Sequence, residues 1–330
     1  NKQFTLFSIL ALVVVGVAVF APQIAPYDPL DAVMLESLQA PSSAHPFGTD
    51  KLGRDVSISQ KPQRVIILDY NALDLWYHAG GTAVGRTGHI LVDSRADEDE
   101  MGSEIKNVPI MNEAHDPVNI EMIVAQEPDL IIISPTNKTH LEAVESFEQY
   151  NIPYFAWDYD DFDGFIENLE LFTLLNDRGD LYEKYASDNI IRVNAVREKI
   201  SGQEPVTMVM LLPHATNGIY ALANSGYLGN LCEDMNLENI AGVETSTVVS
   251  IESLLDIDPE WIFSRGGSGD GSEANAKAIF ESYPLWSELT AVKEGRFQHL
   301  PAELFLYHAN TRYADAYEYL ANLVYPQIFN

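Results

Sequence analysis

Short apolar runs alternate with amphipathic stretches along residues 61–330. The apolar runs have the length of buried strands, and the stretches between them place apolar residues at helical spacing. The predicted strands are residues 65–68, 128–134, 152–157, 206–212, 261–264 and 297–300. The predicted helices are residues 71–78, 118–126, 138–150, 162–175, 178–200, 251–257, 274–282 and 311–324. Asn71 is the candidate N-cap of the first helix. The alternation predicts an α/β fold with mainly parallel sheets that helices cover on both faces.

One phrase occurs twice, in residues 120–134 and in residues 251–264. In each copy a glutamate stands seven residues before a proline that has an acid on either side, and the copy ends in an apolar run and a serine. The two glutamates are Glu121 and Glu252. Such a duplication predicts two similar three-layer α/β/α lobes that face each other across a cleft and are joined by one long helix, residues 178–200. A cleft between lobes indicates a binding function.

Composition divides the chain further. The expected parts are a transmembrane anchor or signal segment at residues 1–21, an extracytoplasmic tether at 22–60, an N-terminal ligand-binding lobe at 61–177, the linking helix at 178–200, and a C-terminal ligand-binding lobe at 201–330. Residues 4–21 hold no charged side chain, and as a helix they would be long enough to cross the hydrocarbon of a bilayer. Pro22 follows Ala21, the only plausible cleavage point, which favours an uncleaved N-terminal transmembrane helix over a signal peptide.

Charge and missing motifs exclude several function classes. The net charge of −30 repels nucleic acid and anionic lipid headgroups, so we expect no nucleic-acid partner. Cys232 is the single cysteine, so no intrachain disulfide can form. The sequence contains no G-x-x-x-x-G-K-[ST], H-E-x-x-H or G-x-S-x-G motif. We therefore expect a protein that is not an enzyme and has no intrinsic cofactor.

Residues 61–330 resemble the ABC-transporter substrate-binding proteins with a helical backbone, the class that serves ferric siderophores, haem and cobalamin. The resemblance rests on Pro-Gln-Arg-Val-Ile-Ile-Leu at residues 62–68 and on Asn-Ile-Glu-Met-Ile-Val-Ala-Gln-Glu-Pro-Asp-Leu-Ile from Asn119 onward. The second copy of that motif and the final Tyr-Pro-Gln-Ile-Phe at residues 325–329 add to it. The match covers about four-fifths of the chain.

This resemblance implies a monomeric, extracytoplasmic component of an ABC importer that binds an iron–siderophore-type complex, an Fe(III) chelate, between its lobes. Its partners would be a permease and ATPase subunits. In that class a glutamate on each lobe pairs with arginines of the permease, and Glu121 and Glu252 match those positions. The simpler explanation is that each glutamate favours a helix N-terminus. Haem or cobalamin binding on the same scaffold is an alternative, and a metal-dependent enzyme is another.

The ligand-binding residues are expected where strand-end loops converge. The candidate loops are residues 69–71, 86–89, 158–163, 214–217, 264–267 and 305–312. Tyrosine and histidine suit Fe(III), haem or a catecholate, and arginine can pair bidentately with an anionic chelate. The candidate residues are Tyr70, Asn71, His89, His214, Arg265, Tyr307, His308 and Arg312. For each of these residues, ordinary packing or surface use is the alternative.

Residues 3–55 resemble the start of the permease subunits of dipeptide and oligopeptide ABC importers. This second resemblance rests on Phe-Ala-Pro-Gln-Ile-Ala-Pro-Tyr-Asp-Pro at residues 20–29 and on His-Pro-Phe-Gly-Thr-Asp-Lys-Leu-Gly-Arg-Asp at residues 45–55. The other membrane spans of such a permease do not follow, so the resemblance does not imply a channel. It implies a fusion in which residues 4–21 attach the binding lobes to the outer face of the cytoplasmic membrane.

Overall fold

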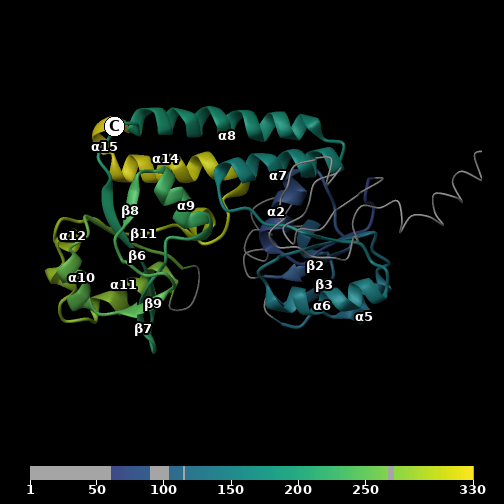
Figure 1. Ribbon diagram of the computed structural model, residues 1–330, viewed down its shortest axis with the longest axis horizontal. Coiled ribbons are helices and arrows are strands. Elements are labelled where there is room, and N and C mark those ends of the chain that lie inside the picture. Colours follow the sequence, from purple (N-terminus) through teal and green to yellow (C-terminus); the bar gives the residue numbers. More distant parts are fainter. Residues whose placement is uncertain (1–60, 90–103, 114–115, 267–270, 330) are drawn as a thin grey trace, which may run out of the picture. The chain divides into compact units, whose positions relative to one another are not determined.

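The structure is a computed structural model that describes residues 61–89, 104–113, 116–266 and 271–329 (Figure 1). Its described residues divide into two compact units. Unit 1 holds the described residues up to Ala72 together with Ala83–Asp158, and unit 2 holds Leu73–Thr82 and the residues from Tyr159 onward. The predicted membrane helix, tether and permease-like segment, at residues 1–60, lie outside the described residues. Within the described ranges no helix has the length and hydropathy that a membrane crossing requires.

Unit 1 is built on a five-stranded sheet in the order β3-β2-β1-β4-β5, and all neighbouring strands are parallel. The strands are β1 (Val65–Ile67), β2 (Gly85–Gly88), β3 (Ile110–Glu113), β4 (Leu130–Ile133) and β5 (Tyr154–Ala156). The helices of this part of the chain are α2 (Tyr70–His78), whose last residues belong to unit 2, α5 (Ile120–Ala125) and α6 (Lys138–Gln149). Every residue of β4 is buried, as expected for a parallel strand covered on both faces.

Unit 1 differs from the sequence-based predictions at three points, and one of them is strand β3, which was not predicted. The N-cap predicted at Asn71 is wrong, because α2 begins at Tyr70 and the carboxylate of Asp69 accepts the backbone N–H of Ala72 at 2.9 Å. The loop predicted at residues 86–89 is also wrong in its first part, because Gly85–Gly88 is the buried strand β2. A side chain at Gly85 would lie about 3 Å from Met111. Glycine thus allows β2 to pack closely, although it weakens the apolar pattern of the strand.

Unit 2 contains a six-stranded mixed sheet in the order β11-β10-β6-β7-β9, with β8 paired to β6. The strands are β6 (Val206–His214), β7 (Gly218–Ala221), β8 (Leu237–Asn239), β9 (Thr247–Val249), β10 (Trp261–Ser264) and β11 (Phe297–His299). Strands β6, β8, β10 and β11 are parallel, whereas β7 pairs antiparallel with both β6 and β9. The strand predicted at residues 206–212 is confirmed as β6, whereas β7, β8 and β9 were not predicted.

The helices of unit 2 are α7 (Phe162–Leu175), α8 (Gly179–Ile200), α9 (Gly226–Asp234), α10 (Ile251–Ile257), α11 (Glu273–Glu281), α12 (Thr290–Lys293), α13 (Ala302–Phe305), α14 (Tyr313–Val324) and α15 (Pro326–Phe329). Two 3₁₀ turns, η3 (Trp286–Glu288) and η4 (Asn310–Arg312), complete the unit. The long helix predicted at residues 178–200 is confirmed as α8. It packs against α7 and α14 inside unit 2 (Figure 1).

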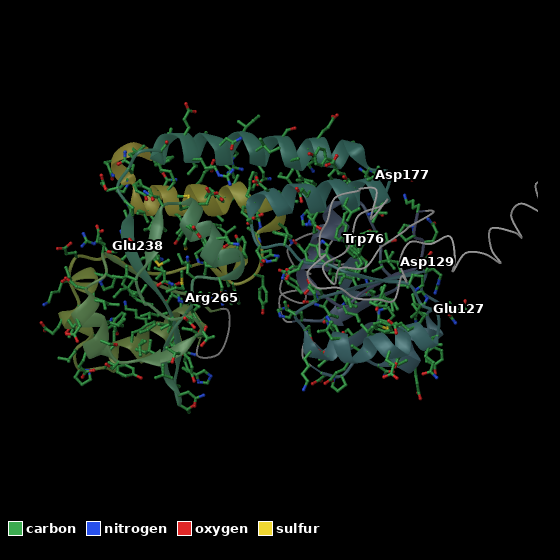
Figure 2. The ribbon with its side chains drawn as sticks, viewed as in Figure 1. Trp76, Glu127, Asp129, Asp177, Glu238 and Arg265 are labelled. Atoms are coloured by element: carbon green, nitrogen blue, oxygen red, sulfur yellow. The ribbon has the colours of Figure 1, made fainter. Side chains whose placement is uncertain are left out.

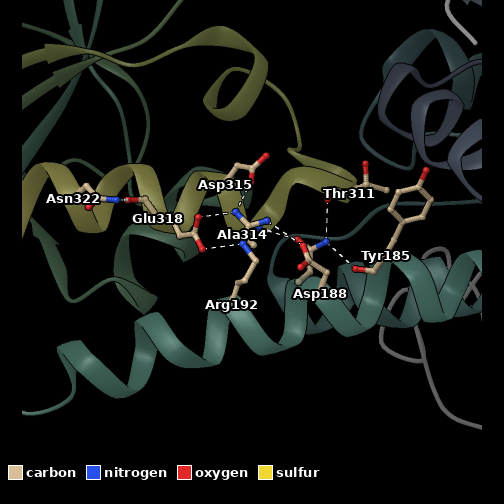
Figure 3. Close-up of polar contacts among 9 residues, drawn as sticks. Tyr185, Asp188, Arg192, Thr311, Ala314, Asp315, Glu318 and Asn322 are labelled. Atoms are coloured by element: carbon tan, nitrogen blue, oxygen red, sulfur yellow. Dashed lines mark hydrogen bonds and ion pairs between the residues drawn. The ribbon is translucent and has the colours of Figure 1, made fainter. Parts of the chain in front are cut away.

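One arginine joins α8 to α14. Arg192 of α8 donates to both carboxylate oxygens of Glu318 at 2.8 and 2.6 Å and to Asp315 at 2.6 Å, and it pairs with Asp188 at 3.0 Å on its own helix (Figure 3). These carboxylates raise the pKa of the Arg192 guanidinium above its ordinary value. A bidentate arginine–carboxylate pair is among the stronger polar contacts, and the arginine also separates acids that would repel one another.

Arg192→Ala should lower the free energy of unfolding by about 1–2 kcal/mol, because three partly exposed carboxylates then lose their shared cation. Urea unfolding followed by circular dichroism measures this loss. Part of it should disappear in 1 M NaCl, since salt screens the remaining repulsion. Lys138→Ala is the matched control, because Lys138 and Glu142 form an exposed pair within α6. Equal losses in the two variants would contradict a special role for Arg192.

Candidate functional site

The duplicated phrase adopts the same local structure in both units. In unit 1 the side chain of Asn119 caps α5 by accepting the N–H of Met122 at 3.1 Å. In unit 2 the hydroxyl of Ser250 caps α10 by accepting the N–H of Ser253, also at 3.1 Å. The glutamates Glu121 and Glu252 are the second residues of the two helices, and both side chains are exposed.

The acid–Pro–acid triplets also have matching roles. Glu127 and Asp258, before the prolines, have left-handed backbones with φ of 46° and 44°. The carboxylate of Asp129, after the first proline, accepts the backbone N–H groups of Gln63 and Arg64 at 2.7 and 2.9 Å. Glu260, after the second proline, accepts from Thr207 at 3.3 Å. Each triplet therefore ties the start of one strand to its neighbour in the sheet.

These matched contacts give each unit an exposed carboxylate at an equivalent point of the fold. The simpler explanation for Glu121 and Glu252, a favourable interaction with the helix N-terminus, also fits their positions. Two carboxylates repeated in this way can in addition pair with two basic groups on one partner, which would set orientation and association rate. The docking role of both residues stays a prediction.

At the carboxyl end of β1 in unit 1, three of the predicted ligand residues lie around Asp69. Tyr70 and Asn71 follow it directly in the chain, and the Tyr70 ring stacks on His89 with a centroid distance of 4.8 Å. Burial raises the pKa of Asp69 to about 6, against the opposing effect of the backbone N–H groups of Ala72 and Asn71. Asp69 was not among the predicted ligand residues, although an acid directly after a buried strand is a signal that can be read from sequence.

Arg265 directly follows β10 in unit 2 and is labelled in Figure 2. Its Nη1 lies 3.5 Å from the carbonyl oxygen of Leu306, a long contact. Its Nε is buried and has no hydrogen-bond partner, and within the described residues no carboxylate forms an ion pair with this guanidinium. Burial lowers the pKa of Arg265, and the nearby Tyr307 opposes that effect. Arg265 is thus a partly buried cation, with a buried Nε, that has no counter-charge among the described residues.

A serine–histidine pair holds the backbone beside Arg265. Ser264 and His299 are partners in the register of β10 and β11, and Ser264 Oγ lies 2.8 Å from His299 Nδ1. His299 Nε2 lies 3.3 Å from the carbonyl oxygen of Gly266. Burial lowers the pKa of His299 below its ordinary value. The sequence analysis missed this pair, because only the alignment of two strands separated by 35 positions brings the residues together.

The segment after β11 carries the other predicted residues. Tyr307 lies near Arg265, and burial raises the pKa of its phenol while Arg265 opposes that rise. The His308 ring lies 4.3 Å from the ring of Tyr159 and meets Tyr227 edge-on at 5.1 Å. Arg312 donates to the carbonyl oxygen of Glu303 at 2.9 Å. Arg265, Tyr307, His308 and Arg312 therefore belong to one region of unit 2.

His214 is the last residue of β6 and is exposed in the hairpin with β7, where its ring meets Tyr220 edge-on at 6.5 Å. A shallow pocket near this hairpin includes none of the predicted ligand residues. It is lined by Ala215, Asn275, Ala278, Ile279, Ser282 and Tyr283. In the part of the chain that the structure describes, no three His, Cys, Asp or Glu side chains are grouped as metal ligands.

The chain is similar to known proteins both in sequence and in fold. The family model described as periplasmic binding protein matches residues 65–304. The vitamin B12-binding protein of Vibrio campbellii is 25% identical over 237 residues, which cover 70% of this chain and 82% of that protein. The Fe(3+)-citrate-binding protein YfmC of Bacillus subtilis is 24% identical, with 73% of each chain covered.

Solved structures share the fold. The TroA-like periplasmic binding protein FepB from Veillonella parvula aligns with a TM-score of 0.67 at 21% identity, covering 84% of this chain and 89% of that one. The periplasmic vitamin B12 binding protein BtuF of Vibrio cholerae aligns with a TM-score of 0.63 at 22% identity, covering 80% and 97%. This likeness confirms the predicted α/β fold with parallel strands.

Asp69→Asn should change how stability depends on pH. The folded chain keeps the Asp69 proton up to a pH of about 6, whereas the ordinary pKa of an aspartate carboxyl is 3.8. Between about pH 4 and pH 6, folding therefore takes up a proton at Asp69. The stability that the protonated Asp69 contributes is lost as the pH rises through this range. The native chain should lose about 1–3 kcal/mol more than the variant between pH 4 and pH 7. Asparagine can still cap α2.

Urea unfolding at each pH measures this difference, and carboxyl ¹³C resonances report the titration of Asp69 directly. Parallel stability–pH curves for the native chain and the variant would contradict the raised pKa.

Proposed function

Because the chain belongs to the periplasmic binding protein family, we propose that it is the extracytoplasmic solute-binding component of an ABC importer. Its ligand is an iron–siderophore-type complex, an Fe(III) chelate, which it delivers to a permease that works with ATPase subunits. Membership of a family of binding proteins supports, at family level, the prediction that this chain is not an enzyme. The attachment to the cytoplasmic membrane through residues 4–21, the fusion of residues 3–55, the boundaries of the lobes and linking helix, and the monomeric state stay predictions.

The observation that carries this proposal is the repeated position of Glu121 and Glu252. A capped helix presents each glutamate at its second residue, and an acid–Pro–acid triplet then leads into a central strand of the sheet. Neither side chain forms an ion pair with another described residue. Two carboxylates that are exposed and equivalent suit a partner that presents two basic patches, as a permease made of two similar halves would.

The surroundings of Arg265 support an anionic ligand. A partly buried guanidinium without a counter-charge loses part of its hydration, and an anion that reaches it would compensate for that loss. Ferric chelates of carboxylate or catecholate type carry such negative charge. One relative is named as a Fe(3+)-citrate-binding protein, which supports the same class of ligand. Tyr70, Asn71, His89, His214, Tyr307, His308 and Arg312 are the further ligand contacts that we propose, and the inter-lobe position of the ligand stays a prediction.

Cobalamin is the second candidate ligand, because one relative of 25% identity is named as a vitamin B12-binding protein. Haem on the same scaffold is a variant of this candidate. Haemin and cyanocobalamin have strong visible absorption bands, and a shift of either band on mixing with the full chain would favour them. A chelate-binding protein should instead respond to ferric citrate or to ferric 2,3-dihydroxybenzoate.

Arg265→Met should weaken the binding of ferric citrate by about ten- to a hundredfold, the effect of losing a charge-assisted contact. Tryptophan fluorescence of the full chain during titration measures this affinity. Arg265→Lys should retain part of the affinity, because it keeps the charge but not the planar fork. Arg296→Met is the matched control, since Arg296 pairs with Glu294 and donates to the Glu260 carbonyl oxygen. An unchanged affinity in Arg265→Met would contradict the proposed contact.

The double variant Glu121→Arg with Glu252→Arg reverses the charge of both proposed docking residues. It should abolish the uptake of ferric citrate into cells and leave the affinity of the purified chain for ferric citrate unchanged. Repulsion between like charges would prevent the productive encounter with the permease. Uptake of ⁵⁵Fe-labelled ferric citrate in cells measures the first effect, and fluorescence titration measures the second.

The matched control for this pair is Glu145→Arg with Glu273→Arg. Both residues are exposed, one in each unit, and Glu273 lies in the first turn of α11, so this control includes the loss of a favourable helix-terminus charge. Normal uptake by the double reversal, or equal loss of uptake by the control, would count against the docking role.

A further inference from the structure

Asn310 combines burial with an unusual backbone conformation. It lies three residues after Tyr307, its relative exposure is 1%, and its φ is 50°. Residues other than glycine rarely adopt this left-handed region, and asparagine is among those that tolerate it best. The conformation turns the chain between Tyr307 and His308, two of the residues proposed to contact the ligand, and α14, which begins at Tyr313.

The Asn310 side chain uses both ends of its amide. Its Nδ2 donates to Asp74 Oδ2 at 2.6 Å, and its Oδ1 accepts from the hydroxyl of Tyr159, also at 2.6 Å. Asp74 lies in α2 and is itself buried, with a relative exposure of 7%. All three residues belong to unit 2. The amide therefore joins segments that are 236 and 151 positions away along the chain.

Tyr159 connects this network to His308. The two rings lie 4.3 Å apart at an angle of 32°, and Tyr159 is almost fully buried. Because the hydrogen bond to Asn310 fixes the phenol end of Tyr159, it also fixes the surface on which the His308 imidazole rests. A change at Asn310 should therefore move His308 without touching it directly.

Other contacts hold the two ends of the same segment. Tyr227 donates to the carbonyl oxygen of Leu304 at 2.7 Å, near its start. At its end, Asn189 of α8 donates to the Thr311 carbonyl oxygen at 2.9 Å and accepts the N–H of Ala314 at 2.8 Å. Between these two ends, the Asn310 contacts tie the segment to Asp74 and Tyr159.

We propose that Asn310 is a positioning residue: it holds Tyr159 against the His308 imidazole and thereby sets the orientation of His308 and Tyr307 for the ligand. The assignment of His308 and Tyr307 to ligand binding rests on the proposed function. The Asp74–Asn310–Tyr159 network is independent of that function. Asparagine suits the position because it can donate to a carboxylate, accept from a phenol and adopt a positive φ at once. Glycine supplies only the backbone conformation, and an aspartate at this position could form a hydrogen bond with Asp74 only if one of the two carboxyl groups were protonated.

The test compares Asn310→Gly with the native full chain. The resonances of the His308 ring report the nearby aromatic ring of Tyr159, and they should move toward those of an exposed histidine in the variant. The affinity for ferric citrate should fall about tenfold, which corresponds to about 1.4 kcal/mol. Spectra are compared at a temperature at which circular dichroism shows both chains to be folded.

Asn236→Gly is the matched control, because Asn236 also has a left-handed backbone, with φ of 58°, and donates to the Gln203 carbonyl oxygen. This control should leave the His308 resonances and the affinity unchanged. Asn310→Asp alone should disturb His308, because it sets two carboxyl groups against each other. Combining it with Asp74→Asn should restore both the resonances and the affinity to within about threefold of native, because a donor–acceptor pair is present again.

Three results would overturn the proposal: native His308 resonances in Asn310→Gly, the same change in Asn236→Gly, or no rescue by the combined variant. A result in which His308 moves and is rescued while ferric citrate affinity stays native would support the positioning of His308. That same result would count against the proposed use of this segment in ligand binding, so the two hypotheses fail in distinguishable ways.

Discussion

The hydrogen-bonded register of the parallel strands determines which polar side chains come together at the strand ends. In unit 2, Ser264 of β10 is the partner of His299 of β11, so the segments that follow both strands leave the sheet at the same edge. That register places Arg265 beside the segment that carries Tyr307 and His308. In unit 1, the same constraint brings Tyr70, after β1, against His89, after β2.

The strands themselves depend on burial on both faces. Every residue of β4 is apolar and buried, as are residues 208–211 of β6 and Ile262 and Phe263 of β10. A slip of register would therefore move large side chains out of their packing positions. This rigid support suits polar residues at the strand ends, which can be held in strained or poorly solvated positions. Arg265, which directly follows β10 and has no counter-charge among the described residues, is such a residue.

Much of the fold could be predicted because the signals are local. The apolar runs at β1, β4 and β10, and the helical spacing of α7 and α8, follow from side-chain periodicity within each segment. The strands β2, β3, β7, β8 and β9 were missed, because each spans only three or four residues, too few to show a periodic apolar pattern of its own. Their strand conformation comes from pairing with neighbours whose register no local pattern reveals.

The sequence by itself determined the α/β class, the positions of the main strands and helices, and the duplicated segments that present Glu121 and Glu252. These features depend on periodicity, capping residues and spacing, which operate over a few neighbouring positions. Only the tertiary structure decided which polar groups meet. The pairing of Asn310 with Asp74 spans 236 positions. Such a contact arises when strands and helices pack and desolvate their polar groups together, so it cannot be inferred from either segment alone.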